Sequence, residues 1–61
     1  MNALQLKMKV DAYKYAIEHN NEEWANSLLC FLEQENYHKL IPLLQNKKFE
    51  EAKTLADSYF K

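Results

Sequence analysis

Apolar residues recur every three or four positions through most of this chain, which is the period of an amphipathic helix. Four segments carry the pattern, and we predict helices over residues 2–19, 21–35, 37–46 and 48–60. Pro42 favours a break or kink near residues 38–41, because proline lacks a backbone N–H and clashes with the preceding helical turn. A three-helix alternative, in which the second and third segments fuse across Asn36, stays open.

Asparagine residues stand at the joints between these segments. This residue tolerates left-handed backbone at the end of one helix and also caps the start of the next. We expect Asn20 to cap the second helix, with Glu23 completing a capping box. The chain contains no glycine, which the tight turns of β-hairpins generally need. The sequence therefore predicts an all-α fold, a small bundle of three to four short helices arranged as antiparallel helical hairpins in one domain over residues 1–61.

One apolar stripe on each of the last three helices predicts the core of the bundle. A domain of 61 residues buries only about 60% of the surface that its unfolded chain exposes, so good packing or association has to stabilise it. We expect the core to include Trp24, Leu28, Phe31, Leu44, Phe49, Leu55 and Tyr59.

The first helix differs, because its apolar residues lie on two nearly opposite faces. We expect the other helices to pack on the face formed by Leu4, Met8, Ala12 and Tyr15. The second face then has no partner within the chain, and it consists of Leu6, Val10, Tyr13 and Ile17. Either this face binds another copy or a partner protein, or its members are singly exposed side chains of the kind found on most protein surfaces. The pattern leaves both interpretations open.

The chain also carries a faint internal repeat at an offset of 27 residues, which pairs Ile17 with Leu44, Glu23 with Glu50, Ala25 with Ala52 and Leu28 with Leu55. The run Asn46-Lys47-Lys48-Phe49-Glu50-Glu51-Ala52, with Ala56, resembles the inter-helix turn and second helix of a tetratricopeptide repeat. The resemblance extends over residues 46–60 and implies that this part packs as an antiparallel helical hairpin. The chain lacks that family's turn glycine and its period of about 34 residues.

Charge and composition narrow the classes of partner. The net charge is −1, all eight basic residues are lysine and arginine is absent. Arginine is the preferred residue for bidentate contacts with phosphate and guanine, so the composition argues against nucleic-acid binding. Lys7 and Lys9 interrupt the apolar residues near the N-terminus, and we expect neither a signal peptide nor a membrane span. A single cysteine fits a reducing compartment, so we expect a cytoplasmic protein.

Residues able to carry catalytic chemistry are few and scattered. His19 and His38 are isolated, and neither forms the close spacing of a zinc site with Cys30. A histidine–cysteine nucleophile pair is formally possible, but we expect Cys30 to be a spectator thiol on the polar side of the second helix. We therefore predict no enzyme, no metal and no cofactor.

Two further features indicate protein binding. Residues 21–35 carry four glutamates and no lysine, and such an acidic face can meet a basic partner. Tyrosine is enriched at interface hot spots, which makes Tyr13 and Tyr37 candidate anchors. The candidate partner-binding residues are thus Leu6, Val10, Tyr13, Ile17, Tyr37, Glu22 and Glu33.

The function predicted from these observations is a small protein–protein interaction module. It would act as an adaptor or inhibitor of a larger protein and self-associate as a homodimer. The alternative is a helix-turn-helix DNA-binding regulator with its fourth helix in the groove. The solvent face of that helix carries Glu50, Glu51 and Asp57, which disfavour contact with phosphate.

Overall fold

The computed structural model describes residues 2–60, and over that range it contains four helices and no strand. These are α1 (Ala3–Glu18), α2 (Glu22–Gln34), α3 (Leu40–Gln45) and α4 (Phe49–Ser58). The predicted all-α class is confirmed, and the four-helix version is the correct one. None of the four is long and apolar enough to cross a membrane.

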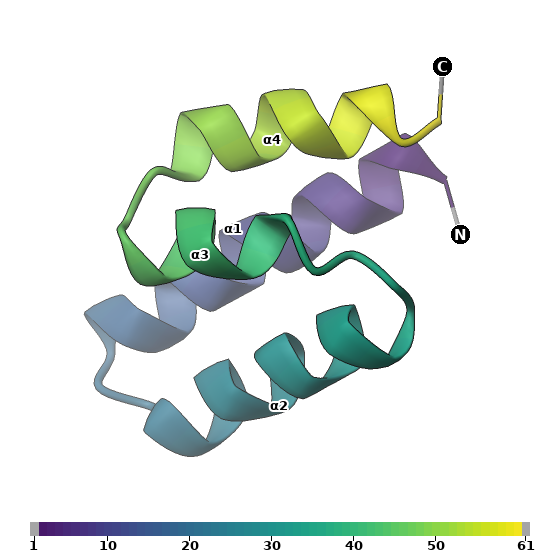
Figure 1. Ribbon diagram of the computed structural model, residues 1–61. Helices are drawn as coiled ribbons and strands as arrows, with labels where there is room; N and C mark the ends of the chain where they lie inside the picture. Colours follow the sequence, from purple (N-terminus) through teal and green to yellow (C-terminus); the bar gives the residue numbers. More distant parts are fainter. Residues whose placement is uncertain (1, 61) are drawn as a thin grey trace.

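The chain runs alternately up and down the bundle (Figure 1), so that consecutive helices are antiparallel. The long helix α1 packs between α2 and α4, and the short helix α3 packs against α4 and α2. Two ion pairs join α1 to α4: Lys7 Nζ lies 3.1 Å from Asp57 Oδ1, and Lys53 Nζ lies 2.7 Å from Asp11 Oδ1. The residue further along α1, Asp11, pairs with the earlier residue of α4, Lys53, so the two helices are antiparallel.

All three turns end the preceding helix with left-handed backbone, and none uses glycine. The φ angles are 56° at Asn20, 65° at Asn36 and 60° at Lys47. In the first turn the Asn20 N–H donates to Ile17 O at 3.1 Å, and the Asn21 N–H donates to Ala16 O at 2.7 Å. This is the Schellman arrangement, and the other two turns repeat it. The expected use of asparagine holds at the first two turns, whereas lysine occupies the position in the third.

The cap of α2 is shifted by one residue from the prediction. Asn21, not Asn20, is the N-cap, and its side-chain oxygen accepts the Trp24 N–H at 3.1 Å. Asn20 instead supplies the left-handed position, and one residue cannot hold both conformations. The third helix also begins later than predicted, at Leu40. Pro42 therefore lies in its first turn, where its missing N–H is one of the first four of the helix, which have no acceptor within the helix.

The buried core lies along one side of α1 and the inward faces of the other helices. On α1 it contains Leu6, Val10 and Tyr13, so the predicted assignment of the two α1 faces is wrong. The two faces differ in the width of their apolar surface. The Leu6 side is apolar at five positions and contacts all three other helices, whereas Asp11 and Glu18 interrupt the opposite side. The full core is Leu6, Val10, Tyr13, Ala16, Ala25, Leu28, Leu32, Leu40, Leu44, Ala52 and Ala56.

The predicted core of the other helices is correct in part. Leu28 and Leu44 are buried, but Trp24 is 40% exposed because it lies in the first turn of α2, at the end of the bundle. The remaining four members are partly buried and pack around the core: Phe31, Phe49, Leu55 and Tyr59. Alanines on α1, α2 and α4 take the central positions, which lets these short helices approach closely.

The 27-residue repeat is visible in the backbone. Each hairpin has its left-handed residue (Asn20, Lys47) and its N-cap (Asn21, Lys48) at equivalent positions. Equivalent positions are also buried, as for Ala25 and Ala52. The two hairpins pack on each other, α1 against α4 and α2 against α3, in a closed bundle rather than as stacked repeats of a solenoid. Residues 46–60 form the inter-helix turn and the second helix, α4, of the antiparallel α3–α4 hairpin.

Candidate functional site

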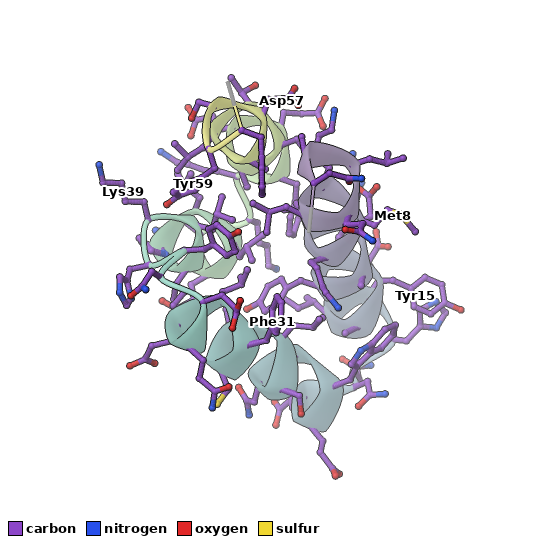
Figure 2. The ribbon with its side chains drawn as sticks, turned by 90° about the vertical axis from the view of Figure 1, so that its right-hand side faces the viewer. Met8, Tyr15, Phe31, Lys39, Asp57 and Tyr59 are labelled. Carbon is purple, nitrogen blue, oxygen red and sulfur yellow. The ribbon has the colours of Figure 1, made fainter. Side chains whose placement is uncertain are left out.

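Large apolar side chains are exposed on the side of α1 that faces away from the core. Figure 2 shows Met8 and Tyr15 pointing outward from α1, away from the other helices. Trp24, at the start of α2, continues the surface across the first turn. We call this the outer surface, and its members with their exposed fractions are Leu4 (63%), Met8 (60%), Tyr15 (55%) and Trp24 (40%).

Local structure fixes both ends of the outer surface. Asn2 and Gln5 form a complete capping box, with bonds of 2.9 and 3.0 Å, which sets the first turn of α1 and the place of Leu4. At the other end, the Tyr15 ring lies 4.0 Å from the His19 ring and meets the Trp24 ring edge-on at 6.1 Å, measured between centroids. These aromatic contacts hold the exposed rings in place.

A shallow groove of about 490 Å³ runs between α1 and α2 beside these side chains. Its floor is Ala12 and Leu28, and Met8 and Trp24 stand at its two sides. Gln5 and Lys9 line the rest, and the Lys9 ammonium lies 4.8 Å from the centre of the Phe31 ring. The small side chain of Ala12 leaves room that a larger residue would fill, so the groove can accept an apolar side chain from a partner.

The second hairpin provides an internal comparison for the outer surface. In the second hairpin, the positions 27 residues after Ala12, Tyr15, His19 and Trp24 are exposed to solvent. Their chemistry is different: the second hairpin has polar, charged or proline residues where the first has apolar and aromatic ones. The pairs are Ala12 and Lys39, Tyr15 and Pro42, His19 and Asn46, and Trp24 and Glu51. Leu4 and Met8 have no counterpart in the second hairpin, because the residues 27 positions later, Phe31 and Glu35, belong to α2 and its C-cap. The first hairpin therefore departs from the solvent-facing pattern that the second hairpin shows.

The structure separates the residues predicted to bind a partner. Leu6, Val10 and Tyr13 are buried in the core and offer no surface, which corrects that part of the prediction. Ile17 is half-buried beside the first turn, and Tyr37 is half-buried against Tyr59, with ring centroids 4.9 Å apart. The two acidic candidates, Glu22 and Glu33, are exposed at opposite ends of α2 and are not brought together.

Sequence reasoning assigned the outer surface to the core and so missed it as a site. The periodicity of α1 found both apolar faces but could not say which one the other helices would cover. The 27-residue repeat held part of the missing signal, because Trp24 has Glu51 as its counterpart in the second hairpin. A position that is acidic in one half of a duplicated fold indicates solvent exposure in both.

Groups with chemical reactivity lie apart from one another. Cys30 is exposed, and its sulfur lies 3.8 Å from Gln34 Nε2. Over residues 2–60 no three His, Cys, Asp or Glu side chains come together in a way that could hold a metal ion. Burial raises the pKa of Tyr13 above its usual 10.0, and the hydrogen bond to Asp11 raises the pKa of Lys53 above 10.5. Both groups stay in their ordinary protonation states near neutral pH.

The outer surface is thus the one feature of the described residues that combines large exposed apolar area, fixed aromatic rings and an adjacent groove. Comparison of the chain with protein-family models, with curated proteins and with solved structures finds no match.

Proposed function

We propose that this protein is a protein-binding module that acts as an adaptor or inhibitor, and that it binds through the outer surface of α1 and α2. The observation that carries the proposal is the chemical contrast between the two hairpins at equivalent exposed positions, such as Trp24 and Glu51. The largest apolar patch on a monomeric protein typically covers about 300–600 Å² and is often a functional surface.

The composition of the outer surface suits a hot spot. Trp24 and Tyr15 belong to the residue types that dominate binding energy when a partner buries them. Met8 adapts its unbranched side chain to irregular shapes. Burial of this apolar area contributes about 25 cal/mol per Å² before the entropy cost of association is subtracted.

The binding mode that fits is completion of the bundle by an added helix. The exposed residues of α1 recur at helical spacing, and the groove beside them runs between two antiparallel helices. An amphipathic helix of the partner can lie along α1 and place an apolar side chain between Met8 and Trp24.

The helix-turn-helix alternative receives less support. Glu50 and Glu51 are exposed on α4, and the Lys53 ammonium is engaged by Asp11 at 2.7 Å and by Glu50 at 3.7 Å. A helix with this distribution of charge repels phosphate rather than neutralising it.

A pair of matched double variants tests the proposal. Met8→Glu with Trp24→Glu places two carboxylates on the outer surface, while Gln34→Glu with Gln45→Glu adds the same charge at exposed positions elsewhere. We expect a partner protein that binds the wild type with micromolar or tighter affinity in titration calorimetry to bind the control variant as well. The same partner should not bind the outer-surface variant. Circular dichroism should show equal helical content in all three. Equal binding by both variants would contradict the proposal.

A further inference from the structure

We propose that the outer surface binds a second copy of this chain in a symmetric dimer, with α1 of one copy antiparallel to α1 of the other. The inference rests on the proposed function, since it names an occupant of the same surface. It is drawn from the spacing of residues along α1, the order of charges beside them and the polarity of the second hairpin.

The residues of the outer surface are spaced almost symmetrically about Ala12. Met8 and Tyr15 stand four and three residues away from it, and Leu4 and His19 stand eight and seven residues away. An antiparallel partner centred near Ala12 therefore brings Met8 of one copy to Tyr15 of the other, and Leu4 to His19. A thioether against an aromatic ring is a favourable contact. Ala12, the smallest residue of the stripe, lies where the two helices are closest.

The charges along the edge of this stripe complement themselves in the same arrangement. Lys7, Asp11 and Lys14 lie on the side of α1 that faces α4, because they contact Asp57, Lys53 and Phe49 respectively. Glu18 continues the row one turn later, so that the signs alternate along the edge.

In the antiparallel pair, Lys7 of one copy is level with Glu18 of the other to within about 3 Å along the axis, and Asp11 is level with Lys14 to the same degree. A parallel pair in register would instead place like charges side by side. The order of charges therefore favours the antiparallel dimer.

A two-fold dimer also avoids burying the polar hairpin. If the copies stacked head to tail, the outer surface of one would cover the equivalent positions of the second hairpin in the next. Those positions include Lys39 and Glu51, which would lose water without gaining partners. Pairing two outer surfaces leaves them in solvent, and the assembly closes at two copies.

The exposed area sets the expected strength. The four side chains of the outer surface expose on the order of 400 Å² in each copy. This is below the roughly 800 Å² per partner of a standard stable interface, so the dimer belongs to the weak class. We expect a dissociation constant in the micromolar to millimolar range.

Sedimentation equilibrium tests whether a second copy of the chain binds the outer surface. The wild-type chain is expected to be a reversible monomer–dimer mixture at high micromolar concentration. Met8→Glu should weaken the dimer at least about tenfold, because it places a charge in the contact. The control, Gln45→Glu, is exposed on α3 and should dimerise like the wild type.

Disulfide cross-linking tests the register, in a Cys30→Ser background that removes the exposed native thiol. Ala12→Cys should form a covalent dimer with itself under mild oxidation, since position 12 lies near the two-fold axis. Leu4→Cys should not do so alone, but should cross-link to His19→Cys when the two are mixed. Efficient self-cross-linking of Leu4→Cys, with none at position 12, would overturn the antiparallel arrangement.

A wild-type chain that stays monomeric at millimolar concentration would overturn the dimer. That result would not contradict the proposed function, because a monomer can still bind a different protein. The proposed function is tested separately, by whether the Met8→Glu and Trp24→Glu double variant loses that binding. If the double variant binds every partner as the wild type does, the proposed function fails too.

Discussion

Asn20 and Lys47 occupy the same backbone position in the first and third turns, with φ angles of 56° and 60°. Left-handed backbone disfavours lysine more than asparagine, because the short asparagine side chain can bond locally. We expect Lys47→Asn to stabilise the protein by about 0.5–1 kcal/mol. The reciprocal change, Asn20→Lys, should destabilise it by a similar amount. Thermal unfolding followed by circular dichroism measures both, and a lower melting temperature for Lys47→Asn would contradict the argument.

Val10 is fully buried between α1 and the other helices. Val10→Asp should therefore cost about 3 kcal/mol or more, since it places an unpaired carboxylate in the core. That cost approaches the whole stability of many small domains, so we expect loss of cooperative unfolding in urea. Met8→Asp, two residues away on the outer surface, is the control and should unfold close to the wild type. Native-like unfolding of Val10→Asp would show that its side of α1 is not the core.

Trp24 and Leu32 are both large apolar residues of α2, but only Leu32 is fully buried. We expect Leu32→Ala to cost about 2–5 kcal/mol, because it leaves a cavity in the core. Trp24→Ala should cost only about 1 kcal/mol, since much of the ring already contacts water. Urea titration of the two variants gives both values, and the opposite order would place Trp24 in the core.

Stability should fall at alkaline pH for two reasons. Burial raises the pKa of Tyr13, so the unfolded chain loses the phenol proton first and unfolding is favoured as the pH passes 10.0. The hydrogen bond to Asp11 raises the pKa of Lys53, so this ion pair stabilises the fold below pH 10.5 and is lost as the pH rises through the raised value.

The Tyr13→Phe variant separates the two contributions. It should make the melting temperature fall less steeply between pH 10 and 12 than in the wild type, because only the lysine contribution remains. Tyr37→Phe is the control, since it changes a half-buried tyrosine outside the α1 core face. Identical pH profiles for the wild type and Tyr13→Phe would contradict a role for the Tyr13 phenol.

Much of the fold follows from local rules that act within a few residues. The period of the apolar positions located all four helices, and the asparagines marked the turns, because both signals depend only on backbone preference. Asn20 and Asn21 show the limit of this reasoning: either residue can cap a helix or take left-handed backbone, and only the hydrogen bonds of the folded turn assign the roles.

The candidate site was harder to predict, because it depends on which of two similar α1 faces the rest of the chain covers. Leu6 and Leu4 are equally apolar, so neither residue alone marks the core side. The difference lies in the whole face, because Asp11 and Glu18 interrupt the Leu4 side, while the Leu6 side contacts α2, α3 and α4. Comparison of the two hairpins adds a second signal, since Glu51, the counterpart of Trp24, marks the solvent side.

The start of α1 and the end of α4 lie at the same end of the bundle (Figure 1), where Lys7 and Asp57 join the two helices across 3.1 Å. The first residue of α1, Ala3, and the last residue of α4, Ser58, therefore lie at the same end of the bundle. This geometry suits insertion of the bundle into a surface loop of another protein, because the host needs to separate its loop ends very little. The same closeness allows a circular permutant that is joined across this end and opened at the turn around Asn36.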